Sequence, residues 1–226
     1  MAPPRELSAL PFAHLLSPHE GAIEPDERYD TVLFEGLAFD GAEAGDCLFT
    51  ECAFAAATFT GGSYRRSRFG DVWLHGVRVV GTDLAETRWL DTAVISAAFA
   101  GVEAFSTQWR RVVFEGCKLD SVNFRASEFT DVAFEDCVLR DVDWTGSKLT
   151  GVRFPGSALQ RVRFGKTTMD RADFRGATRL DFADGYESLR GAVIDSGQVV
   201  AMAPMLAAAL GVTVEDDVSG NDHRSQ

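Results

Sequence analysis

The chain has 226 residues, and its 34 Asp and Glu against 22 Lys and Arg give a formal net charge of −12. This charge argues against a nonspecific nucleic-acid binder, because phosphates repel a net anion. No apolar run reaches the roughly 18 residues of a membrane helix, and the first residues, MAPPRELSALPFAHLL, lack the features of a secretory signal. With four cysteines and no CxxC pair, the composition is typical of a cytoplasmic protein.

The N-terminal segment, residues 1–28, is irregular and contains several prolines. It has no periodic pattern of its own, unlike the region that follows it. We expect it to cap the first coil of that region, because an uncovered β-solenoid end exposes unpaired backbone groups and invites aggregation.

Residues 29–176 follow a period of five. Every fifth residue from Tyr29 to Phe174 is large and apolar except Ala44 and Ala104, and from Val32 to Ala172 the residue two positions earlier is Val, Ala, Cys, Thr, Ser or Gly in every case but Leu37. Neither the helical period of 3.6 nor the strand period of 2.0 divides five. The pattern predicts an all-β fold, a right-handed quadrilateral β-helix with one pentapeptide per side, twenty residues per turn and about 7.5 coils.

After Phe174 the phase slips, so residues 177–195 are predicted to form a degenerate last turn. Residues 196–215 are predicted to form a C-terminal helix and a short strand. Ser196 would cap the helix and Gly211 would end it. Pro204 lies inside this helix and predicts a kink or two short helices.

The end of this region, Val212-Thr213-Val214, is predicted to be the short strand. Residues 216–226 are predicted to be a disordered tail. The sequence therefore divides into a capping segment, a long repeat, a last turn, a helical segment and a tail.

The chemical motifs that would indicate catalysis are incomplete. Gly165-Lys166-Thr167 resembles the end of a phosphate loop, but Gln160 stands where that loop needs its first glycine. All four cysteines fall at the small inward position, where burial favours an inert packing role. A tightly filled coil also offers no cleft. We therefore expect no catalytic residue, metal, cofactor or small-molecule substrate.

Outward residues twenty apart are expected to stack, so they define columns along the coil. The acidic column consists of Glu43, Ser63, Asp83, Glu103, Asn123 and Asp143, and Asp46 and Glu86 are its neighbours. Two interpretations remain for it. It is either a solvated face or a partner-binding surface made by its carboxylates Glu43, Asp46, Asp83, Glu86, Glu103 and Asp143.

A second column is apolar although its positions should face solvent. The apolar column consists of Leu33, Ala53, Trp73, Ala93, Val113 and Ala133, with Ile95 beside it. Exposed apolar patches of this size mark contacts. Either the N-terminal segment covers the column, or Leu33, Trp73, Ile95 and Val113 bind a protein partner.

The repeat resembles the pentapeptide repeat family, whose pattern is A-(D/N)-L-x-x. Val122-Asn123-Phe124-Arg125-Ala126 and Ala172-Asp173-Phe174-Arg175-Gly176 match it closely, although this chain uses Phe more often than Leu at the centre. In quinolone-resistance members of the family, a C-terminal helix joins two coils end to end. The resemblance thus implies a homodimer. The alternative is a helix that only caps its own coil. The dimerisation residues would be Val199, Met202, Met205, Leu206 and Leu210.

The resemblance also implies a function. Members of the family bind bacterial type II topoisomerases, DNA gyrase or topoisomerase IV, as DNA mimics and protect them from quinolones or peptide toxins. One observation opposes this: residues 30–175 hold 21 acids and 17 bases, a charge of only −4, and their C-terminal third is basic. The alternative is a scaffold or regulatory module that binds another protein through the apolar column.

Overall fold

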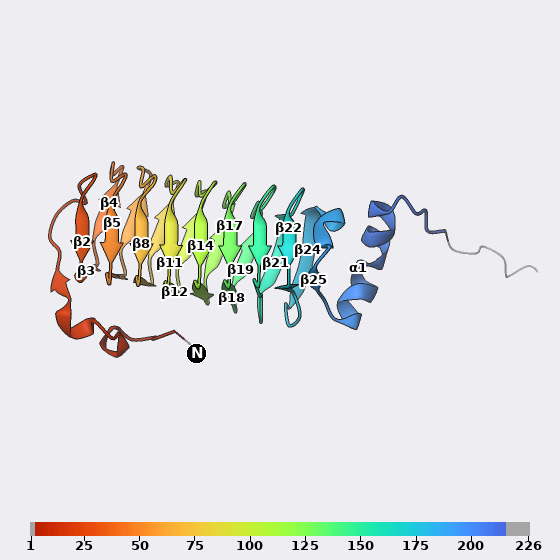
Figure 1. Cartoon of the computed structure of the whole chain (residues 1–226), viewed down its shortest axis with the longest axis horizontal. Coiled ribbons are helices and arrows are strands. Elements are labelled where there is room, and N and C mark those ends of the chain that lie inside the picture. The colour runs from red at the N-terminus through yellow and green to blue at the C-terminus, as the bar shows by residue number, and fades with distance from the viewer. Residues whose placement is uncertain (1–2, 216–226) are drawn as a thin grey trace, which may run out of the picture.

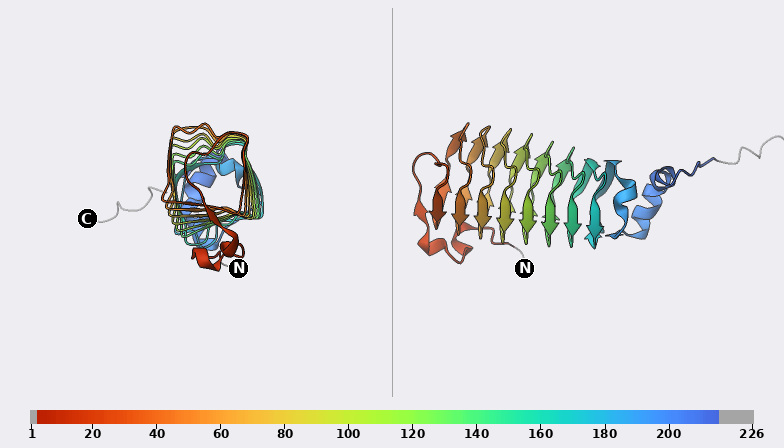
Figure 2. Two further views of the ribbon diagram at one scale, coloured as in Figure 1. Left: turned by 90° about the vertical axis from the view of Figure 1, so that its left-hand side faces the viewer. Right: turned by 45° about the horizontal axis from the view of Figure 1, so that its top comes forward.

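The computed structural model describes residues 3–215 and has the shape of a rod (Figure 1). The rod is a parallel β-solenoid of about eight turns with a single C-terminal helix, which confirms the predicted all-β fold. Seen along its axis, each turn is a square, and the turns lie over one another (Figure 2). The predicted tail, residues 216–226, lies outside the described residues.

Three sides of the square are sheets, and one side is a line of isolated bridges. Face 1 contains β2 (Arg28–Asp30), β5 (Leu48–Thr50), β8 (Arg68–Gly70), β11 (Arg88–Leu90), β14 (Gln108–Arg110), β17 (Glu128–Thr130), β20 (Lys148–Thr150) and β22 (Thr168–Asp170). Face 2 contains β1 (Ser17–Pro18), β3 (Val32–Glu35), β6 (Ala53–Ala55), β9 (Trp73–His75), β12 (Ala93–Ile95), β15 (Val113–Glu115) and β18 (Ala133–Glu135), and further along β23 (Ala172–Asp173) and β25 (Ala192–Val193).

Face 3 contains β4 (Ala38–Asp40), β7 (Thr58–Thr60), β10 (Arg78–Val80), β13 (Ala98–Ala100), β16 (Lys118–Asp120), β19 (Val138–Arg140), β21 (Ala158–Arg163) and β24 (Arg179–Asp184). Face 4 has bridges that run from Glu43 to Arg163. The register within the repeat is twenty residues, so that Trp89 pairs with Phe69 on one side and with Trp109 on the other.

The interior of the rod is a stack of large side chains. The ring centroids of Trp89 lie 3.8 Å from those of Phe69 and 4.8 Å from those of Trp109, and both pairs are nearly parallel. Small residues fill the space beside them: Cys117 and Cys137 are buried free thiols one coil apart. The period of five is therefore explained by one large residue on the axis per side and one small residue at its flank.

The corners of the square use a backbone conformation that the sequence analysis did not anticipate. Every fifth residue from Thr31 to Gly176 has a positive φ. Glycine adopts this conformation freely, whereas other L residues are disfavoured there by steric contact of their Cβ atom. Many corners nevertheless carry Asp, Arg or Ser, for example Asp91 and Arg111. The tight inward turn demands this conformation at every corner, so the stacked coils impose it.

The N-terminal segment does two things. Residues 17–24 close the end of the rod: β1 pairs with β3, and the side chain of Ile23 is buried in the interior cluster. The residues before them turn back and run along face 2, where the 3₁₀ helices η1 (Leu7–Ala9) and η2 (Ala13–Leu15) lie (Figure 1).

The C-terminal end differs from several expectations. The last coil contains β24, the 3₁₀ helix η3 (Tyr186–Leu189) and β25, and its pairing shifts from 21 residues at Leu159–Leu180 to 20 at Val162–Phe182. Helix α1 (Ser196–Ala209) is one helix that includes Pro204, not two short helices.

The cap of α1 is Asp195 rather than Ser196. The Asp195 carboxylate accepts from the Gln198 backbone N–H, and the Gln198 side chain accepts from the Asp195 N–H, which forms a capping box. The strand predicted at 212–214 is absent from this part of the described chain. It has no neighbouring strand edge with which to pair, because α1 separates it from the coil (Figure 1).

Candidate partner-binding surfaces

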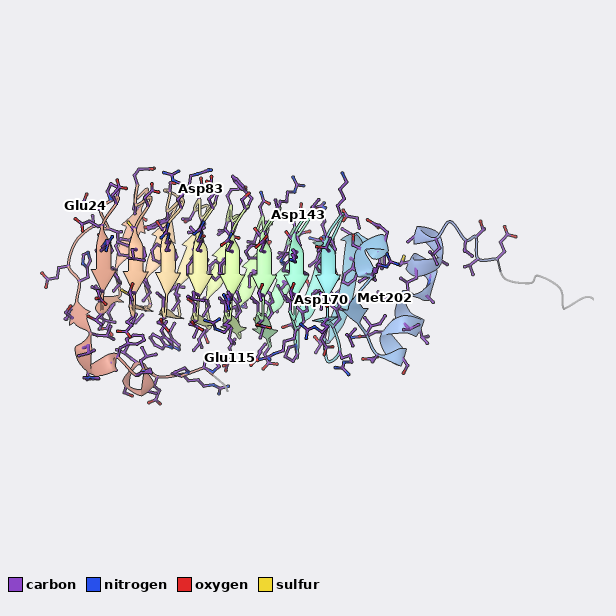
Figure 3. The ribbon with its side chains drawn as sticks, in the orientation of Figure 1. Glu24, Asp83, Glu115, Asp143, Asp170 and Met202 are labelled. Atoms are coloured by element: carbon purple, nitrogen blue, oxygen red, sulfur yellow. The ribbon has the colours of Figure 1, made fainter. Side chains whose placement is uncertain are left out.

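The acidic column exists as a spatial row. Consecutive bridges join its members along face 4, and Asp83 and Asp143 lie at the same edge of the rod (Figure 3). The row ends at Arg163, which forms an ion pair with Asp184. The spacing of twenty therefore brings the column's residues together.

Two of the column's four carboxylates, Asp83 and Asp143, form ion pairs within the chain. The Arg65 guanidinium donates to Asp83 at 3.1 Å and also pairs with Glu86, and it lies 5.3 Å from the ring centroid of Phe105. Glu103 accepts a hydrogen bond of 2.6 Å from the Asn123 amide. Part of the row's negative charge is thus offset by arginines on the same surface, whereas the Asn123 amide holds Glu103 without offsetting its charge.

Asp143 is the most strongly held of these carboxylates. Its side chain is only 10% exposed, it accepts from Arg125 Nε at 2.8 Å, and it accepts from the Thr145 backbone N–H at 2.9 Å. Burial pushes its pKa upward, but the hydrogen bonds from Thr145 and Arg125 outweigh burial and hold the pKa below its usual value. Asp143 is an internal structural partner more than an open contact.

Asp46 is paired in a different way, across one coil at a corner. Arg66 Nε donates to its Oδ1 at 2.9 Å, and this contact lowers the pKa of Asp46. Arg111 with Asp91 and Arg161 with Asp141 repeat the arrangement further along the rod. Of the column's carboxylates and their two neighbours, Glu43 alone has no ion-pair or hydrogen-bond partner within residues 3–215.

Unpaired carboxylates gather instead at the N-terminal end of the rod. We define the acidic end as Asp30, Glu35, Asp40, Glu43 and Glu51. None of them has an ion-pair partner in the described chain, and the first four lie on faces 1, 2, 3 and 4 respectively. The first coil therefore carries a carboxylate without an ion-pair partner on each of its four sides, and on face 1 Arg28 stands two residues from Asp30 on the same strand.

The apolar column is covered by the chain's own N-terminal segment. Leu10 and Phe12 are buried against Ala53, Trp73 and Ile95. Trp73 is 3% exposed and Ile95 is 4% exposed, while Leu33 and Val113 are half-buried. Of the two occupants that the sequence left open, the N-terminal segment is the one that lies on the column here.

Polar contacts fix this segment, which we call the strap (residues 4–16). The Trp73 indole N–H donates to the Pro4 carbonyl at 2.8 Å, and Arg5 forms an ion pair with Glu115. Glu115 lies on the lower side of the rod, where the strap passes (Figure 3). The sequence signal for the strap was the apolar pair Leu10 and Phe12 in an otherwise irregular segment.

The proposed dimerisation residues differ in burial. Met202 is buried against the end of the coil, and Leu206 is half-buried there. Val199, Met205 and Leu210 point into solvent, with Leu210 81% exposed. The end of the coil therefore covers Met202 and part of Leu206, and it leaves the other three proposed dimerisation residues in solvent.

A comparison with known families identifies the repeat. A sequence model described as the pentapeptide repeat region matches residues 95–164. The chain contains a pentapeptide repeat region. No curated protein matches it by sequence.

Solved structures similar to this chain share little sequence with it. A trypsin-treated variant of QnrB1, a plasmid-mediated fluoroquinolone resistance protein, is 19% identical with a TM-score of 0.42, and the match covers 88% of this chain and 95% of that one. HetL, a pentapeptide repeat protein involved in heterocyst differentiation regulation from the cyanobacterium Nostoc, is 15% identical with a TM-score of 0.34, and the match covers 76% and 87%.

The interior of the pentapeptide repeat leaves little room for a ligand. Its internal cavity has a volume of about 20 Å³ and is lined by aromatic and aliphatic side chains, among them Tyr64, Leu74 and Val79. This space holds about one water molecule. Among the described residues no three His, Cys, Asp or Glu side chains gather as a metal site, and no helix is long and apolar enough to cross a bilayer. Recognition by the outer surface is the chemistry that this arrangement offers.

Proposed function

We propose that this chain is a rigid protein-binding rod that presents its acidic end to a cationic protein surface, and that this surface is the DNA-binding region of a type II topoisomerase. The observation that carries the proposal is the ring of uncompensated carboxylates Asp30, Glu35, Asp40 and Glu43 around the first coil. Carboxylates distributed around a rod resemble the phosphates around a duplex and pair with Lys and Arg in the same way.

The C-terminal helix supports a second part of this proposal, a dimer. Val200, Met205 and Leu210 are exposed at 75%, 51% and 81% at the far end of the rod from the acidic end. Exposed apolar groups gathered at one place favour self-association. Two copies joined through α1 would form a double-length rod with an acidic end at each tip.

The experiment is DNA supercoiling by DNA gyrase, titrated with the protein with and without ciprofloxacin. We expect inhibition or protection from the drug, and we expect the double variant Glu35→Lys/Glu43→Lys to weaken either effect at least tenfold, since it reverses two open contacts. The matched control is Glu128→Lys/Glu187→Lys, which makes the same charge change at exposed positions outside the acidic end.

The outcomes separate the parts of the proposal. Equal weakening by both double variants would mean that net charge matters and the acidic end does not. No effect of the wild-type protein on gyrase or topoisomerase IV would contradict the topoisomerase partner. Light scattering of Met205→Glu/Leu210→Glu tests the dimer separately: the expected result is a monomer with an unchanged circular dichroism spectrum.

One observation favours a second candidate, a scaffold that binds a different protein. Arg65 pairs with Asp83 and Glu86 and Arg125 pairs with Asp143, which offsets two of these three negative charges, so the middle of the rod is less anionic than a duplex. A partner of this kind would bind the middle of the rod through contacts that do not depend on the rod's negative charge.

A further inference from the structure

A group of arginines on face 1 differs from the many arginines of the chain that form ion pairs. Arg65, Arg66, Arg111 and Arg161 each form an ion pair with a nearby carboxylate. Arg68, Arg88 and Arg110 have neither an ion-pair nor a side-chain hydrogen-bond partner among residues 3–215, and all three are exposed. In a chain with an excess of acids, their lack of partners is notable, because carboxylates are abundant on the neighbouring corners.

The backbone register places these arginines against one another. Arg68 on β8 and Arg88 on β11 are direct partners in the parallel ladder, and Gln108 on β14 is the next partner in the same row. Arg110 follows two residues later on the same outward side of β14. Neighbouring strands are about 4.8 Å apart, so two positive charges stand side by side. Like charges in directly opposite positions are destabilising.

The surface between them is hollowed. A groove with a volume of about 400 Å³ is lined by Arg68, Arg88, Ser106 and Gln108, and on its far wall by the ion pair of Arg66 with Asp46 and by Glu86, which is bound to Arg65. The carboxylates of that wall are already engaged. On the other side of face 1, Asp71 has no ion-pair partner in the described chain and bounds the positive surface.

An apolar side chain lies within this positive surface. Leu90 on β11 is 40% exposed, and within residues 28–176 it is the one large apolar side chain that is exposed. Its ladder partners are Gly70, which has no side chain, and Arg110. Arginine is enriched in protein interfaces and in their energetically important centres, and an accessible leucine beside it offers apolar area that a partner can bury.

We propose that Arg68, Arg88, Leu90 and Arg110 form a docking site for an acidic segment of a protein partner, one that places carboxylates on the guanidinium groups and an apolar side chain on Leu90. The positive surface spans only three coils, roughly 10 Å between its outer strands, and Glu128 and Asp170 lie further along the same face. This length fits a few acidic residues and not a long polyanion such as DNA. Leu90 gives an apolar contact that a phosphate backbone would not use.

This site is separate from the acidic end and from the strap. Face 1 carries it, whereas the strap lies on face 2 and the acidic column on face 4. The proposal therefore does not depend on the proposed function. A partner bound here would leave the acidic end accessible.

The test is fluorescence anisotropy with a labelled peptide that has six glutamates and one central leucine, measured with the full-length protein. We expect saturable binding in the range of tens to hundreds of micromolar that weakens as salt increases. Arg68→Gln/Arg88→Gln should weaken it at least tenfold, because two charge-assisted contacts are lost, and Leu90→Ser should weaken it about threefold or more. The matched control is Arg78→Gln, which removes an exposed, unpaired arginine from face 3.

Several outcomes would overturn the proposal. These are an absence of saturable binding up to about 1 mM, equal weakening by Arg78→Gln, or no effect of Leu90→Ser, which would reduce the interaction to nonspecific charge. Tighter binding of a twelve-nucleotide oligothymidine than of the peptide would assign the site to single-stranded nucleic acid instead. Circular dichroism of each variant checks that the coil is intact, and loss of binding counts only for variants that keep the wild-type spectrum.

Discussion

The two ends of this rod are closed in different ways. At the N-terminal end, β1 extends face 2 by one strand, Ile23 is buried in the interior, and the ring of His19 lies against Tyr29 and Phe34. At the C-terminal end, the Gln198 side chain donates to the Phe174 carbonyl. Both ends satisfy backbone groups that an open solenoid would expose.

The difference lies in the apolar surface. The strap uses its own apolar residues, Leu10 and Phe12, to cover the coil. Helix α1 buries Met202 but leaves Val200 and Leu210 in solvent. The N-terminal end is therefore complete within one chain, whereas the C-terminal end keeps apolar surface that a second molecule can cover. One solenoid therefore has an end that is only capped and an end that is capped and also offers a surface for association.

A core substitution in the middle of the rod gives the loss of unfolding free energy with which substitutions at the two ends are compared. Phe124 packs against Trp109, Phe129 and Trp144, with ring centroids 5.2 to 5.8 Å away. We expect Phe124→Ala to lower the free energy of unfolding by about 3–5 kcal/mol, because it opens a cavity between coils. Denaturant unfolding measures this. A loss below about 1 kcal/mol would mean that the interior packs differently from the structure.

Truncations at the two ends should then differ from each other. We expect Ile23→Ala to cost about 2–3 kcal/mol and Met202→Ala about 1–2 kcal/mol, because Ile23 belongs to the continuous interior and α1 can detach without opening a coil. Denaturant unfolding gives the two values, and hydrogen exchange should locate the Met202→Ala effect in α1. A larger loss for Met202→Ala would reverse the comparison of the ends.

Two residues of the acidic column, one near each end of the rod, are expected to differ in how their contribution to stability depends on pH. The hydrogen bonds from Thr145 and Arg125 keep the pKa of Asp143 below its usual 3.8 despite burial. A depressed folded-state pKa contributes stability above the unfolded pKa that is lost as the pH falls through the folded value. We expect Asp143→Asn to cost about 1–2 kcal/mol at pH 7 and close to nothing at an acidic pH below the folded-state pKa of Asp143.

Glu43 is the matched control at the other end of this column, because it has no partner in the described chain. Glu43→Gln should change the free energy of unfolding by less than about 0.5 kcal/mol at either pH. Unfolding curves at the two pH values compare the variants. A pH-independent loss for Asp143→Asn would show that shape, not charge, holds this position.

A stabilising effect is expected from a substitution inside the N-terminal half of the coil. The Tyr64 hydroxyl is buried without a hydrogen-bond partner, and burial raises its pKa. Tyr64→Phe should therefore raise the free energy of unfolding by roughly 1 kcal/mol, since it removes a buried polar group that is unsatisfied. A decrease on denaturant unfolding would indicate that the hydroxyl has a partner, such as a water in the adjacent cavity.

Much of the fold followed from the sequence because its pattern is local and repeated. A large residue such as Phe114 or Phe134 at every fifth position fixes the inward side, and twenty-residue stacking then fixes which outward residues become neighbours, as Asp83 and Glu103 do. The stacking of the acidic and apolar columns could be foreseen for this reason. The residue type at each position of the repeat indicates whether that position is buried, and this inference needs no contact between distant segments.

Other features were decided only by tertiary structure. No pattern in the sequence states that Arg65 turns toward Asp83 and Glu86 while Arg68 and Arg88 stay without partners, because the choice depends on side-chain reach between coils. The strap's path over Trp73 and the exposure of Leu210 depend on contacts between segments far apart in the chain. The sequence by itself determined the coil and its columns; the three-dimensional packing decided which charges and apolar groups remain open to a partner.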